Sequence, residues 1–207
     1  MGLFTVTVTL LAMLSSAACD RHKPDTMTFF VTSVPTGDGG NLGGLAGADA
    51  HCQRLADAAG SRNRQWRAYL STAAEGGRPA VHARDRIGNG PWFNARGVLI
   101  ANNLEDLHSD HNQISRPNAM QEHGKRVFFP HDILTGSEAD GTVASGDATC
   151  RNWTSTIGRA VFGHSDRAGN IGPTANSWNS AHLSNGCSME ELGETGSGGL
   201  FYCFAKD

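Results

Sequence analysis

Hydrophobic residues occur in short groups along the chain, separated by polar and glycine-rich stretches. Residues 27–34 (MTFFVTSV) have the β-branched and aromatic content of a strand. Residues 65–72 (QWRAYLST) alternate apolar with more polar side chains, which indicates a half-buried strand. Residues 97–101 (GVLIA) predict a further strand.

After a glycine-rich loop at residues 36–44, the hydrophobic spacing changes to that of a helix. The apolar positions at helical intervals are Ala48, Cys52, Leu55, Ala56 and Ala59. Gly60 stands where a left-handed residue would end this helix, and Cys52 is expected to face the core from it. Residues 79–87 predict a second short helix.

The remaining chain is rich in loops. Residues 105–126 are polar without a clear period and predict a long loop. Beyond Asp132, short strands are expected around Trp153, Trp178 and residues 201–204. We find no internal repeat, so residues 27–207 are interpreted as one α+β domain with two short helices and small antiparallel sheets.

Composition narrows the possible functions. The 207 residues include 26 glycines and carry a formal net charge of −3. This charge predicts neither nucleic-acid binding nor adsorption to a membrane through a cationic surface.

The N-terminus has the pattern of an export signal. Residues 1–18 carry no charged side chain, and their apolar run, residues 3–14, is shorter than the ~20 residues of a membrane-spanning helix. Small residues precede Cys19, which is the arrangement of a lipidated cysteine, although no Lys or Arg precedes the run. We therefore expect a signal peptide at 1–18, a lipid on Cys19 and a polar tether at 19–26, with ordinary cleavage after Ala18 or an unprocessed tail as alternatives.

Cysteine counting agrees with export. Of the five cysteines, four remain when Cys19 is set aside, and an even number is typical of disulfides in an oxidising compartment. Four cysteines allow three pairings, between which the sequence alone does not choose.

Five motifs in order carry a family resemblance. They are GGLAGADAHCQ (residues 43–53), WRAYLS (66–71), LTGSEADG (134–141), CRNWTS (150–155) and GLFYCFA (199–205). Together they resemble the endostatin domain of collagens and related bacterial lipoproteins, and the resemblance covers nearly all of residues 27–207. It implies a variant of the C-type lectin fold with two nested disulfides, Cys52 with Cys203 and Cys150 with Cys187. It also implies recognition of a glycan or an extracellular protein.

The loop at residues 178–187 lies where sugar-binding C-type lectins carry a Trp-Asn-Asp triplet that holds calcium. Here the triplet is Trp178, Asn179 and Ser180, and a serine hydroxyl is a poor substitute for a carboxylate on calcium. We therefore expect any binding to be independent of calcium. The residues that could still contact a ligand are Asp166, Asn170, Trp178, Asn179, Ser180, His182 and Asn185. In the alternative interpretation, Trp178 belongs to the core and the polar residues satisfy loop backbone.

Two further groups of residues are candidates for binding a metal ion or a sulfated glycan. Candidate metal ligands crowd the polar segment, namely Asp106, His108, Asp110, His111, His123 and His131. They would serve a metal-dependent hydrolase using residues 106–131, but a solvated loop without metal is the simpler interpretation, and we predict no cofactor. Arginines after the first helix, which are Arg54, Arg62, Arg64 and Arg67, could bind sulfated glycans or form a solvated face.

The sequence thus predicts a non-catalytic, lectin-like binding module outside the cytoplasm, attached to a membrane only through a lipid. Its expected partner is a glycan or an extracellular protein. The metal-dependent hydrolase remains the alternative.

Overall fold

The computed structural model describes residues 22–169 and 174–206. Cys19 and Asn170 lie outside the described residues. The eight strands are β1 (Phe29–Val31), β2 (Trp66–Ala68), β3 (Trp92–Phe93), β4 (Leu99–Ala101), β5 (Asp132–Leu134), β6 (Val161–His164), β7 (His182–Leu183) and β8 (Ser197–Ala205). The helices are α1 (Gly44–Ala58), α2 (Leu104–Leu107), α3 (Cys150–Trp153) and α4 (Met189–Glu194), with one 3₁₀ turn at Ala83–Asp85.

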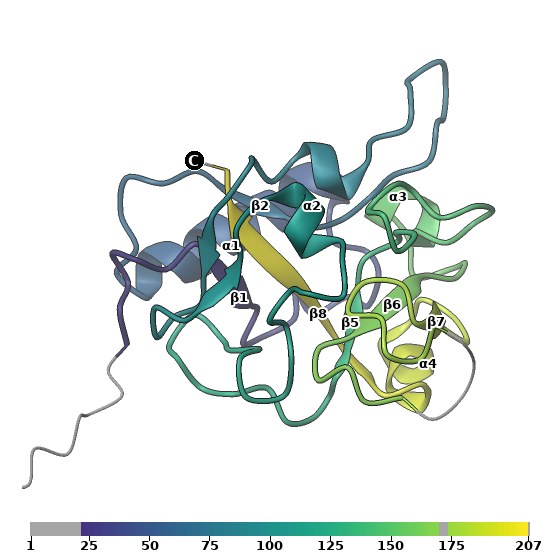
Figure 1. Ribbon diagram of the computed structural model, residues 1–207. Coiled ribbons are helices and arrows are strands. Elements are labelled where there is room, and N and C mark those ends of the chain that lie inside the picture. The colour runs from purple at the N-terminus through teal and green to yellow at the C-terminus, as the bar shows by residue number, and fades with distance from the viewer. Residues whose placement is uncertain (1–21, 170–173, 207) are drawn as a thin grey trace, which may run out of the picture.

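A six-stranded mixed sheet organises the fold. Its order is β1-β8-β5-β6-β7, and β2 also pairs with β8. The pairing of β5 with β8 is parallel and the other pairings are antiparallel. Strands β3 and β4 form a separate two-stranded sheet. Figure 1 shows β8 in yellow through the middle of the molecule, with β1 and β2 toward one end and β5 to β7 toward the other.

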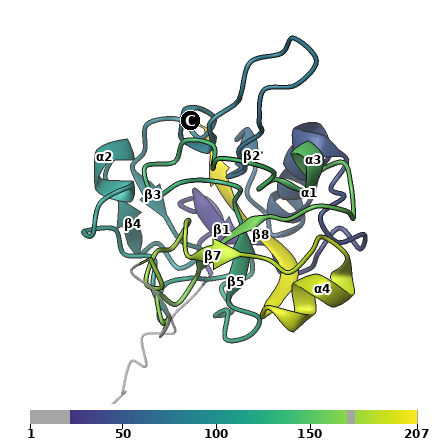
Figure 2. The same cartoon turned by 90° about the vertical axis from the view of Figure 1, so that its right-hand side faces the viewer.

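The sheet separates two hydrophobic clusters. In Figure 2 the α1 and α3 helices lie on one side of the sheet, and α2, β3 and β4 lie on the other. Because side chains alternate along a strand, Phe201 and Cys203 of β8 join the cluster under α1, whereas Tyr202 and Phe204 join the cluster under β3 and β4. A central strand buried on both faces explains the nearly continuous hydrophobic run at residues 200–205.

The α+β class is confirmed, but the element count differs from the sequence prediction. There are four helices among the described residues where we expected two, and the main sheet is mixed where we expected antiparallel sheets. The predicted helix at 79–87 reduces to the turn at Ala83–Asp85. Neither Trp153 nor Trp178 lies in a strand, because the first ends α3 and the second lies in a loop.

The first helix forms as its spacing predicts. Ala48, Cys52 and Ala56 recur every four residues and are buried against the sheet. After α1 ends, Gly60 adopts a φ of 89°, and the N–H of Ser61 bonds the carbonyl of Ala56. This is the left-handed termination that glycine permits.

A buried ionic group joins α1 to the strand that follows it. Asp49 accepts hydrogen bonds from Arg86 Nη2 at 2.7 and 2.9 Å, from Arg67 Nη1 at 2.8 Å and from the N–H of Ala68 at 2.9 Å. The side chains of Asp49 and Arg86 are each only 11 % exposed. The carboxylate thus fixes the position of α1 relative to β2 and the 83–86 turn.

Two disulfides close the domain. The bonds join Cys52 to Cys203 and Cys150 to Cys187, which is the nested pairing that the family resemblance implies. The first links α1 to β8 across a sequence separation of 151 residues. The second links α3 to the loop before α4.

The α3 turn has left-handed backbone. Cys150, Arg151, Asn152 and Trp153 have φ values of 47°, 52°, 57° and 65°. Consecutive left-handed residues other than glycine cost roughly 1–2 kcal/mol each. The turn is held by its disulfide, by Trp153 Nε1, which donates to the carbonyl of Ser71 at 2.7 Å, and by Asn152 Oδ1, which accepts from the N–H of Ala73 at 2.8 Å.

Candidate functional site

Histidine and aspartate side chains gather where β5, β6 and β7 meet. Asp132 begins β5 and is the register partner of His164, which ends β6. His182 begins β7 opposite Phe162, so that it shares a face of the sheet with His164 two residues further along β6. His131 precedes β5 and completes the group, which we call the His–Asp cluster: His131, Asp132, His164 and His182.

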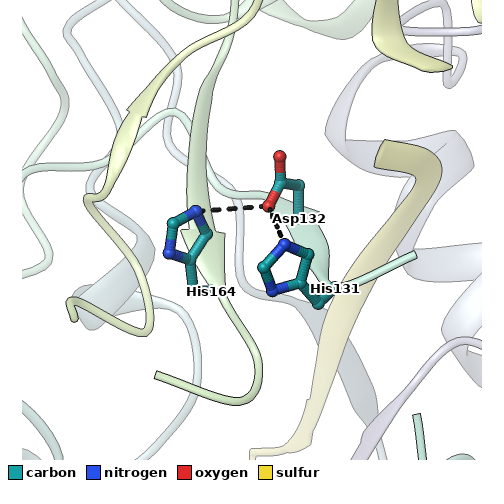
Figure 3. Close-up of side chains that lie close together, drawn as sticks. All are labelled: His131, Asp132 and His164. Atoms are coloured by element: carbon teal, nitrogen blue, oxygen red, sulfur yellow. Dashed lines mark ion pairs between the residues drawn. The ribbon is translucent and has the colours of Figure 1, made fainter. Parts of the chain in front are cut away.

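The ring nitrogens of the cluster converge on one carboxylate. Asp132 Oδ1 lies 3.4 Å from His131 Nε2 and 3.2 Å from His164 Nε2, and Asp132 Oδ2 lies 3.4 Å from His182 Nε2 (Figure 3 shows the first three residues). His164 Nε2 and His182 Nε2 are 3.0 Å apart. His131 and His164 stack with ring centroids 4.8 Å apart. Potential ligand atoms of His131, Asp132 and His164 all lie within 4.8 Å of one another, so these residues could hold a metal ion.

Each histidine is oriented through its other nitrogen. Nδ1 of His131 lies 2.9 Å from Asp166 Oδ1, Nδ1 of His164 lies 2.6 Å from the carbonyl oxygen of Ala175, and Nδ1 of His182 lies 3.2 Å from that of Leu183. Carbonyl and carboxylate oxygens only accept, so each Nδ1 carries the proton in these bonds. The three Nε2 atoms are thereby directed at Asp132.

The electrostatics of the cluster favour a charged carboxylate. Burial alone would raise the pKa of Asp132, but the close approach and charge of the His164 and His182 rings lower it below its ordinary value. The nearby Asp132 carboxylate raises the pKa of His182, against the opposing effect of burial. Asp132 is 1 % exposed, whereas the His131 and His182 side chains are 28 % and 39 % exposed, so the carboxylate is buried while two of the rings reach the surface.

Two residues predicted to contact a ligand are buried. Trp178 is 3 % exposed in the cluster under β3 and β4, and its Nε1 donates to the carbonyl of Leu107 at 3.1 Å. Asn179 is 1 % exposed, and its amide donates to Tyr69 Oη and to the carbonyls of Glu138 and Ala139. The core interpretation of Trp178 therefore fits the structure, and the side chain of Asn179 is committed to internal hydrogen bonds.

The other predicted residues divide between the cluster and the surface. Asp166 accepts from His131 and Arg116, and Ser180 donates its N–H to Ser177 Oγ. His182 belongs to the His–Asp cluster. Asn185 is exposed and donates to Glu194 at 3.3 Å. Asp166 and His182 are thus brought together around Asp132, and Asn179 and Asn185 are not.

The histidine-rich segment does not form one centre within the described residues. Asp106 accepts from Asn102, while His108 is held between Tyr69 Oη and the carbonyl of Leu104. The side chain of Asp110 is 99 % exposed, and that of His123 is 52 % exposed beside Glu122. Of the six candidate ligands in this segment, His131 alone belongs to the His–Asp cluster.

Sequence reasoning missed Asp132 and His164. Each lies at one end of a short strand, and their approach depends on the pairing of β5 with β6. The sequence shows neither that pairing nor the end at which it brings side chains together. The adjacent pair His131-Asp132 was visible, but only His131 was recognised as a candidate.

An exposed apolar face lies on the segment that leads into the cluster. Phe128 and Phe129 are 68 % and 78 % exposed, and they line a cleft of about 290 Å³ together with Pro35, Pro130 and Leu200. A Cβ added at Gly199 would lie 3.4 Å from Pro35 Cβ and 3.3 Å from Met189 Sδ, which places Met189 at the border of the same face. We call these residues the apolar face: Pro35, Phe128, Phe129, Pro130 and Met189.

Comparison with known proteins adds no assignment, since neither a known family model nor a curated protein matches the chain. The described residues form an α+β domain with two disulfides, and such bonds are typical of oxidising, extracytoplasmic compartments. Within residues 22–169 and 174–206, no helix combines the length and the hydrophobicity that crossing a membrane requires.

Proposed function

We propose that this chain is a non-catalytic binding module outside the cytoplasm, which recognises an apolar segment of another extracytoplasmic protein through its apolar face. The observation that carries the proposal is the exposure of Phe128 and Phe129 beside a cleft. Exposed aromatic pairs are uncommon on isolated domains and are typical of protein interaction sites. The relationship to endostatin-like lipoproteins belongs to the same proposal.

The choice of a protein partner over a glycan follows from the polar residues. Sugar recognition needs side-chain hydrogen-bond groups that are free to face the ligand, whereas Asn179 and Asp166 already bond within the domain. The apolar face offers mainly ring and aliphatic surface, which matches an apolar partner. Exposed Lys125 and Arg126 adjoin the two phenylalanines, so the partner segment is expected to carry carboxylates beside its apolar residues.

Attachment to a membrane is the second part of the proposal. A lipid on Cys19 would hold the module at a membrane surface, where several copies could act together. Metabolic labelling with a fatty acid should mark the wild type and not Cys19→Ala. An unlabelled wild type would contradict the anchor but not the binding function.

Display of a peptide library on the purified protein tests the partner class. We expect selection of apolar peptides flanked by Asp or Glu, and a loss of at least ten-fold in affinity in Phe128→Ala/Phe129→Ala, because burying a Phe stabilises a complex by roughly 1.5–3 kcal/mol. Ile157→Ala is the matched control, since Ile157 is 62 % exposed and lies outside the apolar face.

Glycan screening with a chelator present covers the alternative partner. Glycan binding that survives Phe128→Ala/Phe129→Ala would contradict the proposal and favour a lectin. Peptide binding that Ile157→Ala weakens as much as the double substitution does would contradict it as well, because the apolar face would then not be the contact surface.

A further inference from the structure

With all three rings neutral, the Nε2 atoms of the His–Asp cluster meet without a donor between them. Since Nδ1 of His131, His164 and His182 carries the proton toward an oxygen, each neutral ring presents a lone pair at Nε2. These lone pairs face one another and the carboxylate of Asp132, which also only accepts. Acceptors this close repel unless a proton or a cation lies among them.

The carboxylate of Asp132 also lacks a hydrogen-bond donor. Its Oδ1 is buried and makes no hydrogen bond of good geometry with any described residue, although two ring nitrogens approach it. A buried carboxylate oxygen without a partner is costly and is rare in folded proteins. The unsatisfied atom points into the space that the ring nitrogens surround (Figure 3).

The spacing fits a small tetrahedral cation. With metal–ligand distances of ~2.0–2.1 Å, the ligand atoms of a tetrahedral zinc ion lie about 3.3 Å from one another. The separations are 3.0 Å between His164 and His182 Nε2, 3.2 Å and 3.4 Å from Asp132 Oδ1 to His164 and His131 Nε2, and 3.4 Å from the other carboxylate oxygen, Oδ2, to His182 Nε2. Shifts of His131 and His182, whose side chains are 28 % and 39 % exposed, would bring the two remaining pairs, His131 with His164 and His131 with His182, to the same spacing.

We propose that His131, Asp132 and His164, with His182 as the fourth ligand, bind one divalent transition-metal ion of the zinc class. Three imidazoles and one carboxylate suit Zn²⁺ and its neighbours, whereas Ca²⁺ and Mg²⁺ prefer sets of oxygen ligands. Four protein ligands leave no position for a substrate, which is the closed coordination of a structural site. The ion joins β5, β6 and β7 and fixes the loop that leads from the apolar face into β5.

The surroundings of the ligands support this assignment. Metal-binding histidines commonly donate their second N–H to a carboxylate or a carbonyl, which orients the ring and increases its basicity. All three histidines do so here. Asp166, which orients His131, is itself held by Arg116 Nη2 at 3.0 Å and by the N–H of Ala168 at 3.0 Å.

Zinc titration of the purified full chain tests the site. The protein is prepared without a polyhistidine tag, stripped with a chelator and titrated calorimetrically with Zn²⁺, with Ca²⁺ and Mg²⁺ as comparisons. We expect one Zn²⁺ per molecule, no saturable Ca²⁺ or Mg²⁺ signal, and a melting temperature that rises with zinc because the ion binds the folded state alone. Co²⁺ in place of Zn²⁺ should give the visible absorption of a tetrahedral site.

Variants identify the ligands. Asp132→Asn and His182→Ala should each weaken zinc binding about 100-fold or more, and Asp166→Asn, which changes the partner that orients His131 but removes no ligand, by about 10–100-fold. His111→Ala and His22→Ala should bind zinc as the wild type does, since these histidines lie outside the cluster. His182 is partly exposed, so its variant is expected to fold even where Asp132→Asn does not.

Two results would overturn the proposal. The first is a folded wild type that neither binds zinc nor is stabilised by it, which would leave protonated histidines as the partners of Asp132. The second is binding that His182→Ala and Asp132→Asn leave intact or that His22→Ala abolishes.

Discussion

Removal of the Asp49 carboxylate should strongly destabilise the packing of α1 against the rest of the domain. Asp49→Ala deletes the partner of Arg86 and Arg67 and leaves the N–H of Ala68 without its acceptor. Burial lowers the pKa of Arg86, and the charge and hydrogen bonds of Asp49 oppose that effect, so the guanidinium depends on this carboxylate.

The expected loss follows from leaving a buried charge unpaired. Breaking one member of a buried ion pair costs about 3–5 kcal/mol, against a total stability of roughly 5–15 kcal/mol for a domain. Substitution of both partners, Asp49→Leu with Arg86→Met, removes the stranded charge and should recover much of the loss. The matched control is Asp57→Ala on the same helix, whose exposed carboxylate accepts from Gln53 and should change stability by less than about 0.5 kcal/mol.

Denaturation in guanidinium chloride, followed by tryptophan fluorescence, measures these differences. The reasoning requires a lower transition midpoint for Asp49→Ala with an unchanged slope. A loss below about 1 kcal/mol, or a double variant no more stable than Asp49→Ala alone, would show that this ion pair does not hold α1 on the sheet.

Three further outcomes are expected. Replacing the two cysteines of a disulfide by alanines should lower the free energy of unfolding by about 5 kcal/mol for Cys52–Cys203 and by about 4 kcal/mol for Cys150–Cys187, because the first bridge closes the longer loop. Urea denaturation of the two variants measures this difference. Acidification should remove the stability that Asp166 contributes. Burial alone would raise the pKa of Asp166, but hydrogen bonds from His131 and neighbouring groups lower it. The contribution to stability is therefore present above the ordinary pKa of 3.8 and is lost as the pH falls through the lower pKa of the folded state. Stability measured between about pH 5 and pH 2 should therefore fall less steeply in Asp166→Asn than in the wild type. Because φ of Arg151 is 52°, the Arg151→Gly variant should be more stable than Arg151→Ala by about 1 kcal/mol. At Arg54 in α1 the alanine variant should be the more stable one. Thermal melts that show the same order at both positions would refute the left-handed assignment.

The sequence predicted those parts of the fold that depend on local periodicity. The spacing of Ala48, Cys52 and Ala56 specified α1, and Gly60 marked its end, because both signals lie within a few residues of the structure they describe. The strand at residues 27–34 was found for the same reason, although β1 itself is shorter. The β8 strand was located only in part, since its first residues, Ser197 to Gly199, resemble a loop.

Features that depend on contacts between distant segments were not predictable in this way. Trp153 resembles a strand residue by type, yet the disulfide at Cys150 and the carbonyl of Ser71 hold it in a left-handed turn. Asn179 was predicted from its residue type to contact a ligand, and only the fold shows that Tyr69 and the 138–139 backbone surround its amide. The approach of Asp132 to His164 requires the register of β5 and β6.

The position of β8 in the chain affects how the protein can be made. This strand pairs with β1, β2 and β5, and it follows all of them in sequence. A polypeptide emerging N-terminus first therefore holds three strands without their common neighbour until the last segment is available, and such long-range pairing is slow. A chain that stays unfolded during synthesis is suited to threading through a narrow translocation channel. The same topology means that a product truncated before residue 197 would lack the centre of the sheet and the cysteine partner of α1, so it would be a substrate for proteolysis instead of a partly working domain.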